Sequence, residues 1–436
     1  MDVGLLSLAI LGSMLILLLT GLPVSLILIV VAFVPVMIIK GPVALTPMAS
    51  ATFTSITRDV FLALPQFIFM AAVLEMSGLG SAMYGLMHKW MAGLRGGLAM
   101  GTIGISTAMA AMSGSASTAT LTMGMLAYPE MEKRGYDKRM TIGCIPAGGV
   151  LGPLIPPSVL MIIVASVSAT SIGRLFMAGF IPGLVMSFGF MAYIGIRCFV
   201  RPSMGPPLPL EERASWLEKI KSLRGAFLPF LLIIAVLGLI YTGVCAPSEA
   251  GGVGAVGALI CAAVYRNLNL RSLQKATIRC LQITAMLMLL LITAAYFGQM
   301  MGVLGIQIYI RDLLTGLEVS RWVVLGGMLG LVFMMGMFMD DCPITVIFLP
   351  IFFPIAKALG FDPLWFVFLF SLDEVIGLIT PPFGMCLFYF KGLSIPGVTM
   401  MDIYRAIFPY VLISVGVLLL CIVFPPLATW LPSTMI

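Results

Sequence analysis

Long apolar runs, separated by short polar connections, follow one another along the whole chain. Most runs have the length of a helix that crosses a lipid bilayer, which needs about 20 apolar residues. The pattern predicts an all-α polytopic membrane protein. Complete membrane spans are expected near 4–20, 23–39, 60–77, 175–200, 226–243, 247–265, 280–303 and 405–425.

Four other apolar segments are interrupted by helix-breaking or polar residues. The segments 98–131 and 322–356 are too long for one helix, so each is predicted to be a re-entrant helical hairpin. The segments 139–170 and 364–390 contain Gly and Pro in their middle and are predicted to be broken helices. Irregular backbone at membrane depth is tolerated only inside protein or beside a polar cavity.

The interruptions recur after 225 positions. Sliding the chain by 225 places Pro156-Pro157 on Pro381-Pro382, Gly152 on Gly377 and Thr120 on Thr345. Duplicated broken helices are typical of secondary transporters. The expected organisation is a first repeat over 1–200, a cytoplasmic linker over 201–225 and a second repeat over 226–436. The linker is expected to be either a short amphipathic surface helix or a solvated connection.

Composition supports a membrane protein. The chain is 61% hydrophobic and only 10% charged, whereas about 25% of residues are charged in soluble domains. The first apolar run has no basic residue before it, so it is expected to be an uncleaved helix. The net charge of +6 requires no nucleic-acid partner, since Lys and Arg lie in short loops. The eight cysteines are scattered and predict neither a disulfide framework nor a metal site.

The distribution of basic residues predicts the orientation. The expected topology places 18 of the 24 Lys and Arg residues on one side, which is therefore cytoplasmic. The window 129–139 has four basic residues, but its equivalent, 354–364, has only Lys357. The two hairpins should therefore enter the membrane from opposite sides, as inverted-topology repeats do.

The hairpin tips and breaks carry the candidate chemistry. Hydroxyls crowd the first tip, and prolines at the breaks leave carbonyl oxygens without helical donors. Sodium, a hard cation, prefers such oxygen ligands. The candidate sodium ligands are Ser113, Ser115, Gly152, Asp340, Thr345, Gly377 and Thr380. The alternative is that these small residues only let helices pack closely, as Gly93xxxGly97, Gly148xxxGly152 and Gly326xxxGly330 suggest.

Helix starts behind the tips and breaks favour an anionic substrate such as a carboxylate. The candidate substrate contacts are Ser115, Ser117, Thr118, Pro156, Ser158, Thr380 and Pro381. No Lys or Arg aligns with a tip or break, and the nearest, Arg139 and Arg174, are expected at loop ends. We therefore expect weak binding of the anion by this chain alone.

Several acidic residues lie in or beside apolar segments, where acids are usually functional. Asp373 and Glu374 align with glycines of the first repeat and could bind a cation, relay a proton or pair with a neighbouring subunit. Glu249 is expected in the first turn of a helix, and Glu75 is expected to serve packing or a subunit contact.

Five motifs in order resemble the large membrane subunit of TRAP (tripartite ATP-independent periplasmic) transporters. These are Leu64-Pro-Gln-Phe-Ile-Phe-Met70, Ser113-Gly-Ser-Ala-Ser117, Gly152-Pro-Leu-Ile-Pro-Pro-Ser158, Ala246-Pro-Ser-Glu-Ala-Gly251 and Gly377-Leu-Ile-Thr-Pro-Pro-Phe-Gly384. The resemblance implies an elevator-type sodium symporter of the ion-transporter superfamily in the bacterial inner membrane. It also implies two partners, a small four-helix membrane subunit and a soluble periplasmic binding protein that delivers an organic acid. Asp340-Asp-Cys-Pro343 departs from the family pattern.

Other function classes fit less well. A self-sufficient sodium/carboxylate symporter of the same superfamily stays open as the alternative. An intramembrane aspartyl protease needs facing aspartates, but Asp340 and Asp341 are adjacent, and His88 is expected in a loop. No GxxxxGK[ST] loop supports an ATP-driven pump, and a channel does not need opposed hairpins. We therefore expect no enzymatic activity and no cofactor besides coupling sodium ions.

Overall fold

The computed structural model describes residues 3–18, 20–57, 60–91, 93–209, 211, 213–316 and 319–435. All regular structure in these ranges is helical, which confirms the all-α prediction. The helices are α1 (Val3–Leu18), α2 (Val24–Lys40), η1 (Gly41–Ala44), α3 (Leu45–Ile56), α4 (Val60–Met76), α5 (Leu79–Met91), α6 (Gly97–Ser113), α7 (Ala116–Lys133), α8 (Lys138–Gly149), α9 (Val159–Ser168), α10 (Ile172–Val200), η2 (Pro202–Met204), α11 (Trp216–Tyr241), α12 (Pro247–Val264), α13 (Leu270–Val303), α14 (Ile306–Thr315), α15 (Arg321–Gly336), α16 (Asp341–Ala358), α17 (Pro363–Gly377), α18 (Met385–Gly392), α19 (Met400–Val423) and α20 (Pro426–Ser433).

Five of the described helices are long and apolar enough to cross a membrane, or six if the bent α11 is counted. Two sequence expectations need correction. His88 is not in a loop but in the last turn of α5, where its Nε2 lies 3.5 Å from Glu130 Oε1. Helix α13 begins at Leu270, ten residues before the predicted span, so Arg279 lies inside it. The amphipathic segment at Trp216 is the first part of α11, which runs on to Tyr241.

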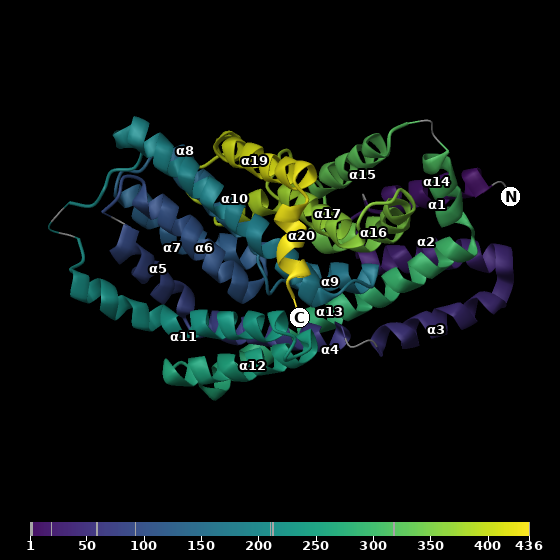
Figure 1. Cartoon of the computed structure of the whole chain (residues 1–436), viewed down its shortest axis with the longest axis horizontal. Helices are drawn as coiled ribbons and strands as arrows, with labels where there is room; N and C mark the ends of the chain where they lie inside the picture. Colours follow the sequence, from purple (N-terminus) through teal and green to yellow (C-terminus); the bar gives the residue numbers. More distant parts are fainter. Residues whose placement is uncertain are drawn as a thin grey trace.

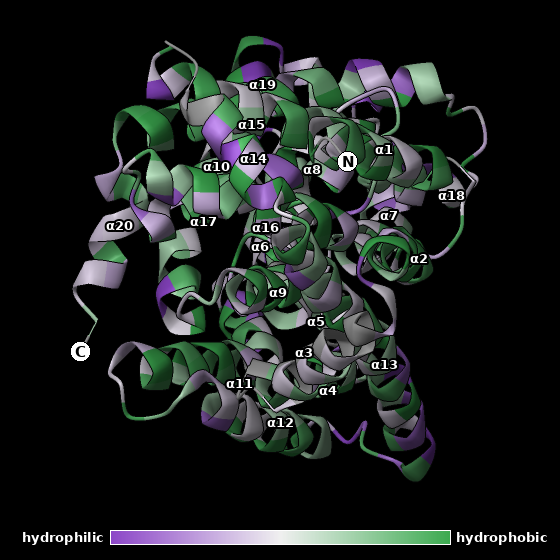
Figure 2. Ribbon diagram, turned by 90° about the vertical axis from the view of Figure 1, so that its right-hand side faces the viewer, coloured by the Kyte–Doolittle hydropathy of each residue, from purple (hydrophilic) through white to green (hydrophobic). Residues whose placement is uncertain are grey.

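The helices form two layers (Figures 1 and 2). The base layer contains α3, α4, α11, α12 and α13, in which α12 and α13 both pack on α4 and α11 packs on α12. The hairpin layer contains α6–α9 and α15–α18. Helix α4 also contacts α6 and α9, and α13 contacts α9 and α16. The two layers therefore meet along α4 and α13.

The hairpin layer contains both predicted hairpins and both predicted broken helices, in the same order in each half. Helices α6 and α7 meet at a tip formed by residues 114–115, and α15 and α16 meet at residues 337–340. Helices α8 and α9 are separated by residues 150–158, and α17 and α18 by residues 378–384. The equivalent bonds Pro156-Pro157 and Pro381-Pro382 are both cis.

Helix α19 extends from the open end of one hairpin to the open end of the other. The open end of a hairpin is the end away from its tip. Near its start, Asp402 Oδ2 lies 2.9 Å from Lys138 Nζ, five residues beyond the end of α7. Near its end, the Cys421 carbonyl accepts a 2.9 Å hydrogen bond from Trp365 Nε1, seven residues beyond the end of α16. A helix of 24 residues is about 36 Å long at 1.5 Å per residue. The two contacts lie 19 residues apart on α19, so the open ends of the hairpins are about 28 Å apart along this helix.

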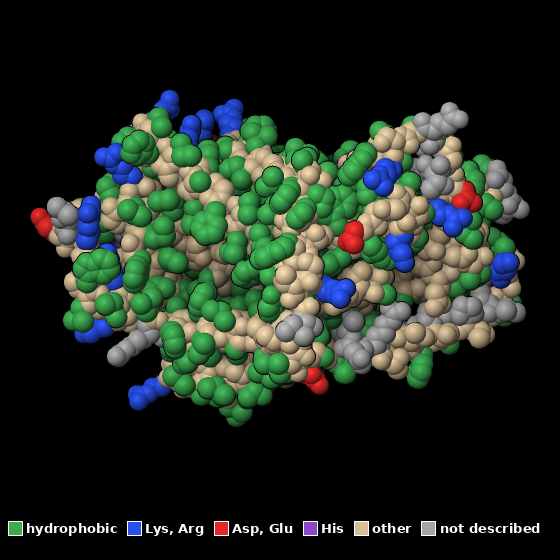
Figure 3. Space-filling model, in the orientation of Figure 1, with side chains coloured by type: hydrophobic (Ala, Val, Ile, Leu, Met, Phe, Trp, Pro, Cys, Tyr) green, Lys and Arg blue, Asp and Glu red, His purple; other side chains and the backbone are tan. Residues whose placement is uncertain are grey.

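The surface agrees with burial in a bilayer. Hydrophobic side chains cover the middle of the face in Figure 3, and most Lys and Arg side chains lie toward its two ends. Exposed Phe188, Phe199 and Val256 are among the apolar side chains that would be costly in water.

Candidate functional site

The first hairpin tip is formed by Gly114 and Ser115 between two apolar helices. Gly114 has a φ of +58°, a conformation that glycine adopts readily. Ser115 is the N-cap of α7 and accepts a hydrogen bond from the Thr118 N–H at 3.5 Å. Its hydroxyl also lies 3.0 Å from the hydroxyl of Ser117. The tip therefore presents hydroxyls and a helix start on one small surface.

The first tip lies directly against the first break. A Cβ atom added at Gly152 would lie 2.8 Å from both the carbonyl carbon and the carbonyl oxygen of Ser115. A Cβ atom added at Gly114 would lie 3.0 Å from the Pro157 carbonyl oxygen. Ser158 begins α9 as its N-cap, and its hydroxyl donates to the Pro153 carbonyl at 2.5 Å. Glycine at 114 and 152 thus permits backbone contact between tip and break.

The second tip carries two carboxylates. Asp340 is the N-cap of α16, and its Oδ2 accepts a 3.4 Å hydrogen bond from the Tyr389 hydroxyl. Asp341 Oδ1 accepts from the Cys342 N–H at 2.8 Å. The tip is joined to the second break because the Gly384 N–H donates to the Met337 carbonyl at 2.9 Å.

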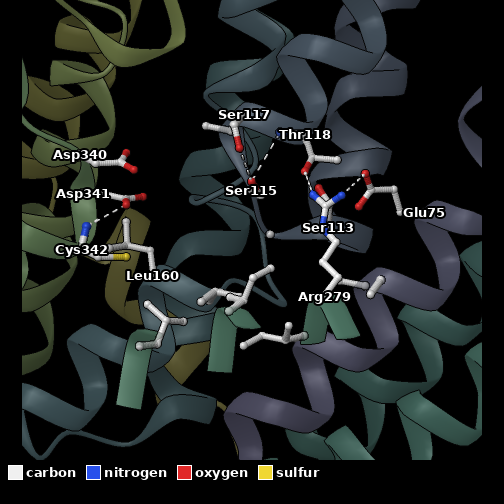
Figure 4. A pocket seen from close by; sticks show the side chains of 18 of the residues that line it. Glu75, Ser113, Ser115, Ser117, Thr118, Leu160, Arg279, Asp340, Asp341 and Cys342 are labelled. Atoms are coloured by element: carbon white, nitrogen blue, oxygen red, sulfur yellow. Dashed lines mark hydrogen bonds and ion pairs between the residues drawn. The ribbon is translucent and has the colours of Figure 1, made fainter. Parts of the chain in front are cut away.

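The two tips meet at a cavity of about 170 Å³ between the hairpin layer and the base layer (Figure 4). The start of α9, helices α4 and α13 and Tyr389 complete its walls. Hydroxyls of the first tip lie across the cavity from the carboxylates of the second tip. The predicted residues that line it are Ser113, Ser115, Ser117, Thr118 and Asp340.

The other predicted residues surround the cavity without lining it. The Thr345 hydroxyl donates to both carboxylate oxygens of Glu374, at 2.9 and 3.1 Å. The Thr380 hydroxyl donates to the Ile376 carbonyl at 2.8 Å. Gly152 and Gly377 contact backbone atoms of the tip and of α15, respectively. Ser158, Pro156 and Pro381 also lie outside the lining, although Val159 and Leu160 directly after Ser158 belong to it.

No Lys or Arg aligns with a tip or break in the sequence, but the structure places one basic residue, Arg279, in the wall of this cavity. Arg279 lines the cavity, with its Nη1 3.3 Å from Glu75 Oε1 and its Nη2 3.5 Å from Thr118 Oγ1. The span expected over 280–303 begins one residue after Arg279 and therefore leaves this residue outside the membrane. Glu75, Asp341, Cys342 and Tyr389 also line the cavity. The sequence signal that could have placed Arg279 in a helix is the amphipathic stretch 270–279, which directly precedes the apolar part of α13.

The structure agrees with the expectations for Glu249 and Glu75, but it does not show close packing at Gly326 and Gly330. Glu249 lies in the first turn of α12, where its Oε2 accepts from the Ala246 N–H at 2.9 Å, as predicted. Glu75 joins α4 to α13 through Arg279, which agrees with a packing role. Gly326 and Gly330 have no heavy atom within 4 Å of an added Cβ, so close helix packing within this chain does not explain them.

Residues 11–427 match the family model described as "Tripartite ATP-independent periplasmic transporter, DctM component". The C4-dicarboxylate TRAP transporter large permease protein of Pseudomonas aeruginosa is 32% identical over 394 residues, which cover 90% of this chain and 91% of that protein. The ectoine/5-hydroxyectoine TRAP transporter large permease protein of Ruegeria pomeroyi is 30% identical and covers 96% of this chain and 97% of that protein.

The fold is also found in a solved structure. The YdaH transporter of Alcanivorax borkumensis matches with a TM-score of 0.65 over 90% of this chain and 89% of that chain, at 16% identity. That likeness concerns the fold alone, whereas the family model and the curated relatives concern the sequence over nearly its whole length. The chain therefore belongs to the DctM family, the large permease component of tripartite ATP-independent periplasmic transporters.

Proposed function

We propose that this permease imports an organic acid by sodium symport through an elevator mechanism. In this proposal the hairpin layer carries the substrate and slides against the base layer. A small four-helix membrane subunit completes the membrane part, and a periplasmic binding protein delivers the acid. The complex lies in the bacterial inner membrane. The proposal assigns no covalent chemistry and no cofactor apart from sodium ions.

One observation carries the proposal: both hairpin tips line one cavity at the junction of the two layers. Twelve of its 20 lining residues belong to the hairpin layer, and the other eight belong to α4 and α13 of the base layer. A solute bound there would contact both layers, so movement of one layer against the other would carry it. Tips from the two halves of the chain provide different groups, hydroxyls from the first and carboxylates from the second.

The charges of the cavity explain why the anion would need a cation. Asp340 and Asp341 line it together with the Glu75–Arg279 ion pair, so the ionised side chains would sum to an excess of negative charge. Two like charges 4 Å apart repel by about 4 kcal/mol at an effective dielectric constant of 20. A carboxylate would enter such a cavity readily only when cations neutralise the aspartates. Sodium binding at the second tip would thus favour binding of the acid.

The substrate class follows from the relatives and from the cavity together. The names of the two relatives above specify C4-dicarboxylates in one and ectoine or 5-hydroxyectoine in the other. All of these molecules carry a carboxylate. The helix start at Ser115, the hydroxyls beside it and Arg279 are suitable partners for such a group.

The test is uptake by proteoliposomes that contain this chain and its small subunit. Succinate, malate and ectoine are supplied singly at micromolar concentration, with and without an inward sodium gradient and the cognate binding protein. We expect uptake of one acid only when both the gradient and the binding protein are present. Uptake without a sodium gradient would contradict symport. Strong micromolar uptake without the binding protein would favour the self-sufficient symporter.

A further inference from the structure

Arg279 has an unusual position for a basic residue of a membrane helix. It lies nine residues after the start of α13, about 14 Å along the helix axis. Basic residues within membrane-spanning helices usually face a water-filled cavity and serve a function. Among the described residues that line the cavity between the tips, Arg279 is the only basic one.

The contacts of Arg279 leave it suited to a further anionic partner. A guanidinium has five N–H donors and favours two parallel hydrogen bonds with a carboxylate. Glu75 lies 3.3 Å from Nη1, and the side chains of Arg279 and Glu75 are 44% and 30% exposed. Thr118 Oγ1 accepts from Nη2 at the long distance of 3.5 Å. Exposed ion pairs of this kind contribute about 0–1 kcal/mol, so a substrate carboxylate can replace Glu75 at low cost.

The opposite walls of the cavity would orient a charged substrate. Figure 4 shows Arg279 on the side of Thr118, and Asp340 and Asp341 on the other side of Ser115 and Ser117. A carboxylate is repelled by the aspartates and attracted by Arg279 and by the helix start at Ser115. One carboxylate of the substrate would therefore point to Arg279, and cations would lie toward the aspartates.

A second cavity adjoins the first one beside the residues that contact Arg279. It has a volume of about 300 Å³, extends between α4–α5 and α6–α7, and is lined mainly by apolar side chains that include Met109, Met112 and Met125. The two cavities share Ala71, Glu75, Ser113 and Thr118. Glu75 and Thr118, the two residues that contact Arg279, thus form part of the boundary between the cavities.

We propose that Arg279 recognises the carboxylate of the transported acid, which exchanges for Glu75 as the partner of the guanidinium. This inference rests on the proposed function and names a residue for its substrate specificity. Arg279 belongs to the base layer, whereas Thr118 and Ser115 belong to the first hairpin. A carboxylate held by both layers is recognised only while the tip lies beside Arg279 and is released from the arginine when the hairpin layer moves.

The test measures sodium-driven uptake of succinate, malate and ectoine by the complete complex with its binding protein. Arg279→Gln should raise the apparent KM for the transported acid at least tenfold and leave the sodium dependence unchanged. Arg279→Lys should restore part of the affinity, because it keeps the charge without the paired donors. Arg271→Gln, an exposed position at the start of the same helix, is the matched control and should behave as the unmodified protein.

The double variant Glu75→Gln/Arg279→Gln separates recognition from a structural ion pair. It leaves neither charge unpaired, so it should fold even if Arg279→Gln alone does not. A raised KM in the double variant supports recognition by Arg279, and a normal KM overturns it, as does a normal KM in Arg279→Gln. If the unmodified complex transports none of the three acids with sodium, the proposed function fails first, and the inference fails with it.

Discussion

The hydroxyl of Thr345 donates to both carboxylate oxygens of Glu374, at 2.9 and 3.1 Å, and both residues are fully buried. The equivalent positions in the first half of the chain are Thr120 and Gly149. A Cβ atom at Gly149 would lie only 1.9 Å from Thr120 Oγ1. The position that packs against this threonine is therefore Gly149 in the first half and Glu374 in the second half. The two halves thus differ chemically about one helical turn beyond each hairpin tip.

Removing the hydroxyl at Thr345 should destabilise the protein. Thr345→Val keeps the shape of the side chain but leaves the buried Glu374 carboxylate without this donor, which costs about 1–3 kcal/mol. The measurement is the melting temperature of the purified complex in detergent. Thr141→Val is the matched control, because the Thr141 hydroxyl is buried without a hydrogen-bond partner among the described residues. Equal melting temperatures for the two variants would contradict a stabilising Thr345–Glu374 contact.

Adding one methyl group at Gly152 should separate the first tip from the first break. In Gly152→Ala the new Cβ would lie 2.8 Å from backbone atoms of Ser115, and relieving this overlap typically costs about 1–3 kcal/mol. We expect a lower melting temperature together with reduced uptake. Gly416→Ala in α19 is the control, since an added Cβ there has no heavy atom within 4 Å. If Gly152→Ala transports as well as this control, close contact between tip and break is dispensable.

The sequence predicted the hairpins and breaks because their signals are local. Glycine, proline and clustered hydroxyls interrupt helices wherever they occur, so Gly114 and Gly152 could be placed from the chain alone. The contact of Arg279 with Thr118 could not be predicted in this way, because it joins positions 161 residues apart in the sequence. That contact depends on how α13 packs on α4 and how the first hairpin lies against both. His88 was misplaced for a related reason, since a polar pair at the end of α5 resembles a loop until Glu130 is seen beside it.

Opposite entry of the two hairpins can be tested at matched positions. Lys133 and Ala358 are 225 residues apart, and both are exposed near the open ends of their hairpins, at the ends of α7 and α16. In a background without the eight native cysteines, Lys133→Cys should react with a membrane-impermeant maleimide only from the cytoplasmic side. Ala358→Cys should react only from the periplasmic side. Labelling of both positions from one side would contradict inverted topology.

The two tips should differ in how strongly they affect sodium dependence. Ser115→Ala removes one neutral oxygen, worth about 1 kcal/mol, and should raise the sodium concentration for half-maximal uptake about fivefold. Asp340→Asn removes a charge and should raise it tenfold or more, because interactions with ionised groups are about twice as strong. The amide can still accept the hydrogen bond from Tyr389, so the tip should keep its fold.

Two controls separate sodium binding from general damage. Ser171→Ala removes another serine N-cap, at the start of α10, and should change stability without changing sodium dependence. Asp312→Asn removes an acid that pairs with Arg311 on α14, away from the cavity lining, and should leave the sodium dependence as it was. A tip variant that is stable and transports with an unchanged sodium requirement would exclude its residue as a sodium ligand. If both tip variants do so, the coupling ion must bind elsewhere, and the buried carboxylates behind the second tip become the next residues to replace.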